Sequence, residues 1–236
     1  MNSSDLLSCF ERDGYLVIEG FFDTELMSGL DRMIRSHFGD NPDFLHDEEF
    51  LDTAQTDVIP WFPQNEGVKA FDEIDADLRL NDLSQSVLGG GWSSQYCMVM
   101  FSKQGTSGQA WHQDCAPDDP NVFNLNRLVY TSDINDEIGG QTVIVPGSHR
   151  HGLLPVGDPT GDFEDQVVLR PKKGTLVLLH GHTWHRVLPI KGACRFSTNY
   201  RAAPAGTPDD VTDVCVYRNM RYQFSASKVV EERVAG

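Results

Sequence analysis

Three side chains of this chain have the types and the spacing that one metal ion requires. His112 and Asp114 are two residues apart, and His185 follows much later. Residues two apart in a β-strand point to the same side, so the first two can reach one ion without distortion of the backbone. Two imidazoles and one carboxylate suit Fe(II) and leave three coordination positions open, as in non-haem Fe(II) oxygenases. We therefore predict that His112, Asp114 and His185 are metal ligands and catalytic residues.

The H-x-D triplet is a weak signal by itself, because the chain contains 8 His and 35 acidic residues and short motifs recur by chance. A comparable H-x-E at 46–48 lies in an acidic stretch without strand-like alternation, which predicts a solvated loop. Context distinguishes the triplet at 112–114. Residues 95–101 have the pattern of a buried strand, and residues 109–111 lead directly into the two ligands.

The second histidine ligand has to be chosen among His180, His182 and His185. His185 precedes Arg195 by ten residues, with a turn at 189–192 between them. This spacing predicts that both side chains lie on neighbouring antiparallel strands and point into one barrel. Arg195 can then bind the far end of a dianionic chelator through a bidentate, charge-assisted pair. We therefore favour His185, and expect the other two histidines to be polar residues at a strand mouth.

The elements around these residues are predicted from hydrophobic periodicity. Short β-like runs separated by turn residues favour an antiparallel sandwich or barrel. These runs are 125–131, 141–145, 166–169, 175–179 and 195–200.

The N-terminal part, 4–88, is predicted to be mostly helical and to pack against the sheet. Ser4 is the expected cap of a first helix, Asp23 or Thr24 starts a second, and a third covers about 67–87. The expected packing residues are Leu26, Leu30, Met33, Ile34 and Phe38 in the second helix, and Phe71, Ile74, Leu78 and Val87 in the third.

Irregular stretches connect these elements. The stretch 39–66 is expected to cover the barrel mouth and to contact substrate, because loops often carry function. Two more irregular stretches are 117–124 and 155–165. The tail beyond Pro204 is expected to place Tyr217, Arg218 and Tyr222 on a surface or in a dimer contact.

Length and composition favour one domain, since 236 residues is a usual size for a single β-rich domain. No apolar run is long enough to cross a membrane and no signal-peptide pattern is present, so we expect a soluble cytoplasmic protein, a monomer or a homodimer.

The five cysteines lack paired spacing, which favours reduced thiols. A net charge of −16 argues against nucleic acid or an acidic membrane as a partner.

The ordered set of motifs resembles the phytanoyl-CoA dioxygenase (PhyH) family of Fe(II)/2-oxoglutarate oxygenases. The matching pieces are the triplet 112–114, the Gly139-Gly140 turn followed by 145–150, the run 174–180, and His185 with Arg195. The resemblance implies a mainly β fold with flanking helices and a double-stranded β-helix (jelly-roll, cupin-like) core. We expect a single domain over 1–236, in which 1–90 is helical support, 91–203 is the core and 204–236 is a C-terminal extension.

The resemblance also implies the roles of the site residues. His112, Asp114 and His185 would bind Fe(II), and Arg195 the C5 carboxylate of the co-substrate 2-oxoglutarate. Ser197 could donate a second hydrogen bond to that carboxylate, although a strand hydroxyl bonded to backbone is an equal alternative. Further candidates for contacts with 2-oxoglutarate are Gln95, Asn126 and Tyr130.

The implied reaction consumes dioxygen and hydroxylates a small-molecule substrate, with release of succinate and carbon dioxide. Two alternatives remain open at this point. One is a 2-oxoglutarate-independent, cupin-like metalloenzyme, for which Arg195 would have no use. The other is a binding protein that keeps the jelly-roll but has lost turnover.

Overall fold

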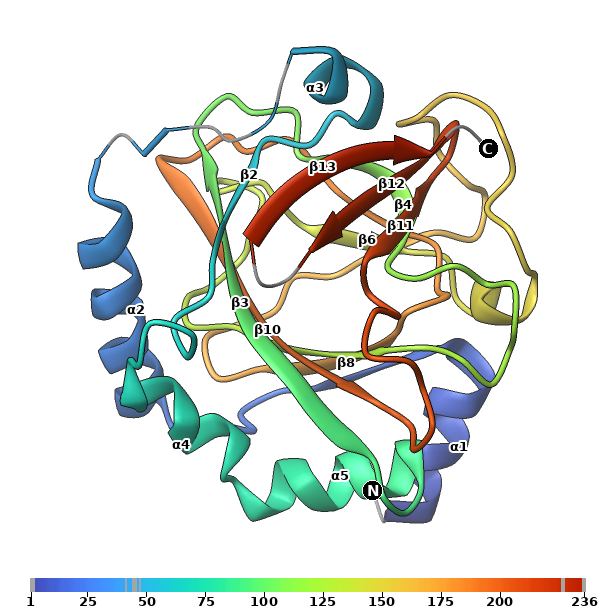
Figure 1. Cartoon of the computed structure of the whole chain (residues 1–236). Coiled ribbons are helices and arrows are strands. Elements are labelled where there is room, and N and C mark those ends of the chain that lie inside the picture. The colour runs from blue at the N-terminus through green and yellow to red at the C-terminus, as the bar shows by residue number, and fades with distance from the viewer. Residues whose placement is uncertain (1–2, 41, 44–45, 47, 226–227, 235–236) are drawn as a thin grey trace.

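Two antiparallel sheets and a layer of helices make up the computed structural model, which describes residues 3–40, 42–43, 46, 48–225 and 228–234 (Figure 1). The larger sheet has the order β1-β8-β5-β10-β3-β2 and the smaller one β13-β12-β11-β4-β9-β6-β7. The strands of the larger sheet are β1 (Tyr15–Ile18), β2 (Val58–Trp61), β3 (Ser93–Lys103), β5 (Leu125–Val129), β8 (Leu176–His180) and β10 (Cys194–Ala203). Those of the smaller sheet are β4 (Gln109–Gln113), β6 (Thr142–Ile144), β7 (Val167–Val168), β9 (His185–Val187), β11 (Val214–Tyr217), β12 (Met220–Ser225) and β13 (Lys228–Val234). The helices are α1 (Ser3–Asp13), α2 (Thr24–Phe38), α3 (Glu48–Ala54), α4 (Asp72–Asp75) and α5 (Leu78–Leu88), with 3-10 turns η1 (Lys69–Phe71) and η2 (Ser148–Arg150).

The long strands β3 and β10 pair along their length and separate two environments. Because side chains alternate across a sheet, one set faces the helices and the other faces the space between the sheets. On β3, Cys97, Val99 and Phe101 belong to the core under the helices, whereas Met98 and Met100 line a cavity between the sheets. The larger sheet is therefore the wall that divides the hydrophobic core from the candidate site.

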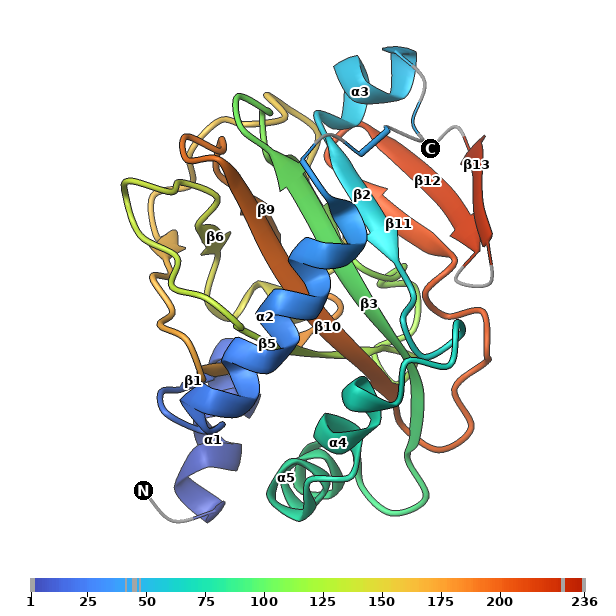
Figure 2. The same ribbon diagram turned by 90° about the vertical axis from the view of Figure 1, so that its left-hand side faces the viewer.

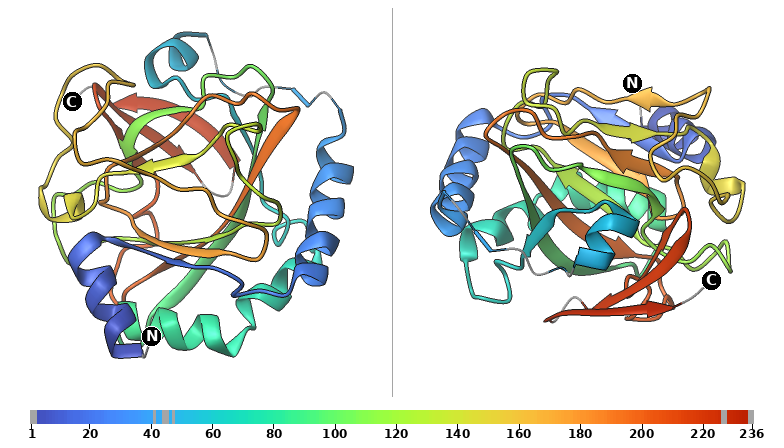
Figure 3. Two further views of the ribbon diagram at one scale, coloured as in Figure 1. Left: turned by 180° about the vertical axis from the view of Figure 1, so that it is seen from behind. Right: turned by 90° about the horizontal axis from the view of Figure 1, so that it is seen from above.

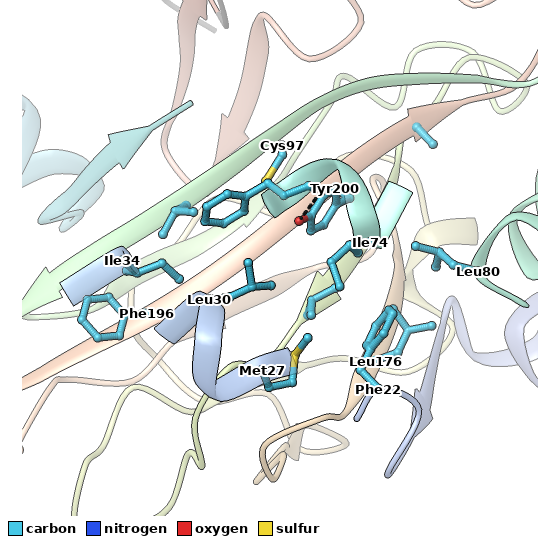
Figure 4. Close-up of a cluster of buried hydrophobic side chains, with 14 of the residues drawn as sticks. Phe22, Met27, Leu30, Ile34, Ile74, Leu80, Cys97, Leu176, Phe196 and Tyr200 are labelled. Carbon is cyan, nitrogen blue, oxygen red and sulfur yellow. Dashed lines mark hydrogen bonds between the residues drawn. The ribbon is translucent and has the colours of Figure 1, made fainter. Parts of the chain in front are cut away.

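Helix α2 supplies much of that core. Its cap is Asp23, as predicted, whose side chain accepts from the backbone N–H groups of Glu25 and Leu26. Figure 2 shows α2 lying across the face of the larger sheet. Met27, Leu30 and Ile34 of this helix pack with Phe196 and Tyr200 of β10 (Figure 4). The expected packing residue Met33 is instead 43% exposed.

The single third helix predicted over 67–87 is wrong. The structure divides this region into η1, α4 and α5. The break occurs because the Asp77 side chain accepts from the N–H groups of Arg79 and Leu80 and so caps a new helix. Leu78, expected to pack on the sheet, is 77% exposed at the start of α5. The first helix begins at Ser3, so Ser4 lies inside it and is not its cap.

Both flanking regions contribute strands to the two sheets. β1 pairs with β8, and β2 pairs with β3, so the N-terminal region adds two strands to the larger sheet. Within the stretch 39–66, which was expected to be irregular, α3 also forms. The C-terminal part continues the smaller sheet, since β11 pairs with β4 and β12 pairs with β11 (Figure 3). The mainly β fold with flanking helices is confirmed. In the part of the chain that the structure describes, no helix is long and apolar enough to span a bilayer.

Candidate metal centre

The three predicted metal ligands converge between the two sheets. His112 on β4 lies opposite His185 on β9, and Asp114 follows β4 directly. One donor atom from each of the three lies within 4.8 Å of the other two. All three residues are buried, with 3%, 6% and 6% of their surface exposed for His112, Asp114 and His185. The strand alternation at His112 and Asp114 therefore does bring the two side chains together.

Backbone carbonyls set the orientation of both histidines. The His112 Nδ1 lies 2.8 Å from the carbonyl oxygen of Ala110, and the His185 Nδ1 lies 2.9 Å from that of Thr183. Since a carbonyl can only accept, each Nδ1 carries the proton and each Nε2 has its lone pair free. The Nε2 atoms face Asp114, at 3.7 Å for His112 and 3.4 Å for His185. Such backbone contacts are typical of metal-binding histidines.

Asp114 is held at both carboxylate oxygens. The Arg201 guanidinium lies 3.0 Å from Oδ1, and the Asn126 amide donates to Oδ2 at 2.7 Å. Asn199 in turn donates to the Asn126 carbonyl oxygen at 2.7 Å, which fixes the direction of the amide. Arg201, Asn199 and Asn126 thus form a polar row that positions the carboxylate.

The protonation states at this centre suit a metal ion. Burial, with a further contribution from His185, lowers the pKa of His112 to about 3, so this imidazole is neutral at neutral pH. Burial is the largest influence on Asp114 and raises its pKa, but the charge of Arg201 and the contributions of His185 and His112 together outweigh burial, and the pKa lies below its usual value. Neutral imidazole and ionised carboxylate are the forms that bind metals, and this donor set fits Fe(II).

Arg195 enters the same space from β10. It is buried, with 3% of its surface exposed, and its Nε donates to the Gly140 carbonyl oxygen at 2.7 Å. Burial lowers the pKa of Arg195, and the Tyr130 hydroxyl opposes that shift. Gly140 has φ +66°, and a Cβ there would lie 2.4 Å from the Arg195 Cδ. The glycine turn therefore leaves the room that Arg195 occupies.

A cavity of about 100 Å³ connects the three candidate metal ligands with Arg195. Its apolar wall comes largely from the larger sheet. The lining residues besides the metal ligands are His46, Thr56, Val58, Pro60, Met98, Met100, Gln109, Asn126, Leu128, Thr142, Leu179, Val187, Arg195, Ser197, Asn199, Arg201, Cys215, Tyr217 and Tyr222.

The other predicted contacts with 2-oxoglutarate differ in their positions. Ser197 and Asn126 line the cavity. Tyr130 is not among the lining residues, but its hydroxyl interacts with Arg195 and lies 3.3 Å from the Thr142 hydroxyl. Gln95 is not among the lining residues and sits at the register shift between β3 and β10, where it has no partner on β10. The structure therefore brings Ser197 and Asn126 to the cavity and leaves Gln95 outside it.

The prediction that His185 and Arg195 lie on neighbouring antiparallel strands is wrong. β9 pairs with β4 and β6 in the smaller sheet, whereas β10 pairs with β3 and β5 in the larger sheet. The turn between them crosses from one sheet to the other. Both side chains still point into one cavity, because the two strands face each other across it.

Several cavity residues were missed or misplaced by the sequence analysis. Arg201 was not identified, although its even spacing from Arg195 places both on one face of β10. Tyr217 and Tyr222 were expected at a surface or dimer contact but are buried, and the Tyr217 ring stacks on His112 at 5.2 Å. His46 was expected in a solvated loop, within the stretch 39–66 that was expected to cover the barrel mouth. It lines the cavity, as do Thr56, Val58 and Pro60 of that stretch, and its Nε2 lies 3.0 Å from the Val58 carbonyl oxygen. Asp47 lies outside the described residues.

The two competing histidines lie elsewhere. The rings of His180 and Phe123 stack with their centres 4.0 Å apart. The centre of the His180 ring lies 5.0 Å from that of His182 and 5.1 Å from that of His149. His180 and His182 are absent from the cavity lining and from the metal-ligand group found among the described residues.

The sequence model of the family described as phytanoyl-CoA dioxygenase (PhyH) matches residues 10–195, from α1 to the cavity arginine. The chain belongs to this family. Two similar proteins are ectoine dioxygenases. The one from Bordetella parapertussis is 26% identical over 184 residues, which cover 73% of this chain and 58% of that protein. The one from Sphingopyxis alaskensis is 27% identical over 172 residues, which cover 66% and 52%. The chain thus spans little more than half the length of these PhyH relatives.

Solved structures share the fold. The non-haem α-ketoglutarate-dependent epimerase SnoN from nogalamycin biosynthesis has a TM-score of 0.68 and 19% identity, with coverage of 92% of this chain and 85% of SnoN. HygX from Streptomyces hygroscopicus, with nickel and 2-oxoglutarate bound, has a TM-score of 0.68 and 15% identity, with coverage of 87% and 88%. The two-sheet core is therefore a jelly-roll that this chain shares with SnoN and HygX.

Proposed function

We propose that this PhyH protein is a non-haem Fe(II)- and 2-oxoglutarate-dependent dioxygenase that hydroxylates a small-molecule substrate. The observation that carries the proposal is one cavity with a two-His, one-Asp metal-ligand group and a buried arginine that can pair with a carboxylate. His112, Asp114 and His185 would hold Fe(II), and Arg195 the far carboxylate of 2-oxoglutarate. Membership of the PhyH family and the likeness to ectoine dioxygenases support this reaction class.

Each residue has a task that follows from its position. Bound Fe(II) would supply the reduction of dioxygen as 2-oxoglutarate is decarboxylated to succinate and one oxygen atom enters a substrate C–H bond. Arg195 would neutralise one end of the dianion and fix its direction. Arg201, with His185 and His112, would keep Asp114 ionised. The apolar lining by Val58, Met98 and Met100 would keep water out and fits a substrate with an apolar body.

The proposal is tested by succinate formation. Purified protein with Fe(II), 2-oxoglutarate and air should form succinate faster when a panel of small molecules contains a substrate. Mass spectrometry should find that this compound has gained one oxygen atom. Asp114→Ala and Arg195→Met should each lose at least about 100-fold in rate, because one removes a metal ligand and the other a buried charge pair.

The alternatives give different results in the same assay. An Arg195→Met variant that oxidises the substrate at the wild-type rate would favour a metalloenzyme that does not use 2-oxoglutarate. Protein that binds Fe(II) and 2-oxoglutarate tightly, yet forms no succinate with any compound in the panel, would favour a binding protein.

A further inference from the structure

Arg201 is a second buried cation in the cavity. It follows Arg195 by six residues on β10, an even number that puts both on the same face of the strand. Its cross-strand neighbour on β5 is Asn126, the residue that donates to Asp114. The Arg201 side chain is only 4% exposed. Its guanidinium therefore lies at the metal-binding end of the cavity and is shielded from solvent.

The contacts of Arg201 account for only part of its hydrogen-bonding capacity. Nη2 lies 3.0 Å from the Asp114 Oδ1, and the guanidinium carbon lies 5.8 Å from the centre of the Tyr96 ring. Nε and Nη1 are buried and have no hydrogen-bond partner among the described protein atoms. An arginine has five N–H donors in a fixed fork, and buried donors on a charged group are rarely left unpaired. The unpaired nitrogens thus mark a site for an acceptor.

Charge balance shows what kind of acceptor fits. Among the described residues that line the cavity, Asp114 is the one carboxylate, while Arg195 and Arg201 are both cations. A divalent ion at the three ligands would add more positive charge beside two arginines that are each 3% exposed. Buried charges are stabilised only when they are paired, so the ligands of this cavity must be anionic. A planar guanidinium fork matches a carboxylate best.

We propose that Arg201 is a second carboxylate-binding residue of this cavity. Its Nη2 holds Asp114, and its Nε and Nη1 donate to the carboxylate of a ligand beside the metal ion. This inference rests on the proposed function, because that ligand belongs to the metal site. The carboxylate has two sources: the keto-acid end of 2-oxoglutarate, whose other end pairs with Arg195, or an acidic group of the substrate.

The inference is tested by binding measurements, which do not require turnover. Protein loaded with Ni(II) is titrated by calorimetry with 2-oxoglutarate, with 2-oxopentanoate, which lacks the second carboxylate, and with hexanoate in the presence of saturating 2-oxoglutarate. The variants are Arg201→Met and Arg201→Lys, which keeps a positive charge beside Asp114 but removes the fork. Arg186→Met is the matched control, because Arg186 is buried and pairs with Asp162 outside the cavity. Ni(II) affinity and thermal stability are measured for every variant.

The two sources predict different patterns. If Arg201 binds the keto-acid end, both variants weaken 2-oxoglutarate and 2-oxopentanoate by about 10- to 100-fold, the loss expected for a charge-assisted pair. If Arg201 binds a substrate carboxylate, both keto acids bind normally and hexanoate alone is weakened by a similar factor. In either case Arg201→Lys should keep its Ni(II) affinity within about threefold, and Arg186→Met should bind every acid normally.

Two results would overturn the inference. Arg201 variants that bind all three acids within about twofold of wild type, whatever their Ni(II) affinity, would limit Arg201 to positioning Asp114. Wild-type protein that binds Ni(II) but none of the acids would remove the inference together with the proposed function. The first result leaves the proposed function intact, so the two failures are distinguishable.

Discussion

At the scale of single residues, each histidine proposed as a metal ligand is oriented by the carbonyl two residues before it, Ala110 for His112 and Thr183 for His185. This pattern fixes the proton on Nδ1 and leaves Nε2 for a metal ion. Asp114 lies just beyond β4, and its N–H donates to the Gly181 carbonyl oxygen at 2.8 Å. The residue types and their alternation could be predicted from the sequence. The polar row behind Asp114 could not, because it depends on which strands become neighbours.

Gly140 offers a prediction about Arg195. A Cβ at Gly140 would lie 2.4 Å from the Arg195 Cδ, at a backbone φ of +66°. Gly140→Ala should displace the guanidinium and weaken 2-oxoglutarate binding by at least about tenfold, and the left-handed backbone should cost about 1–2 kcal/mol of stability. Calorimetric titration of the metal-loaded protein measures the first effect and denaturant unfolding the second.

Gly206→Ala is the matched control for that experiment. Gly206 has φ +81°, and a Cβ there would meet nothing within 4 Å. This variant should show a similar loss of stability and normal 2-oxoglutarate binding. Equal weakening of 2-oxoglutarate binding in both variants would contradict the role given to Gly140, because strain alone would then explain the effect.

At the scale of elements, the period-two patterns predicted the core strands, and β3, β5, β8 and β10 formed close to the predicted bounds. Pairing was harder to predict. β9 and β10 follow each other in the chain but lie in opposite sheets, because a short turn can either form a hairpin or cross between sheets. The strands of the C-terminal part were missed for a related reason: Tyr217 and Tyr222 become cavity residues only when β11 pairs with β4.

The ion pair between Arg127 and Asp75 joins the larger sheet to the helical layer. Arg127 is fully buried on β5, and its Nη2 lies 2.8 Å from the Asp75 Oδ1. Asp75→Ala should lower the free energy of unfolding by about 3 kcal/mol, because it leaves a buried charge without its carboxylate. Adding Arg127→Met should recover part of that loss. Urea unfolding of both variants measures this, and a double variant less stable than Asp75→Ala would contradict the explanation.

At the scale of the whole molecule, buried histidines link folding to pH. Burial lowers the pKa values of His149, His180 and His182, which form a cluster outside the cavity. In the unfolded chain these histidines therefore take up protons near the ordinary histidine pKa of about 6.5. In the folded protein they stay neutral at that pH. Because the unfolded state then binds more protons than the folded state, the free energy of unfolding falls as the pH drops below about 6.5, and this loss is absent above that pH.

Unfolding of the metal-free protein, measured at a series of pH values, tests that relation. Stability should fall between pH 7 and pH 5.5, and His180 alone should account for about 1.4 kcal/mol per pH unit below 6.5, since it stays neutral in the folded state. His180→Phe, which keeps a ring against Phe123, should reduce the slope by that amount. A slope unchanged by the substitution would show that His180 titrates alike in the folded and unfolded states.

The central claim is that His112, Asp114 and His185 bind Fe(II) and that 2-oxoglutarate chelates the bound ion. The most direct test is an anaerobic titration of metal-free protein with Fe(II) and then 2-oxoglutarate, in which the visible charge-transfer band of the bidentate chelate is followed. We expect a band in the wild type and in His180→Ala, and its loss in His185→Ala. Tight Fe(II) binding without any band, or a band that survives His185→Ala, would contradict the account.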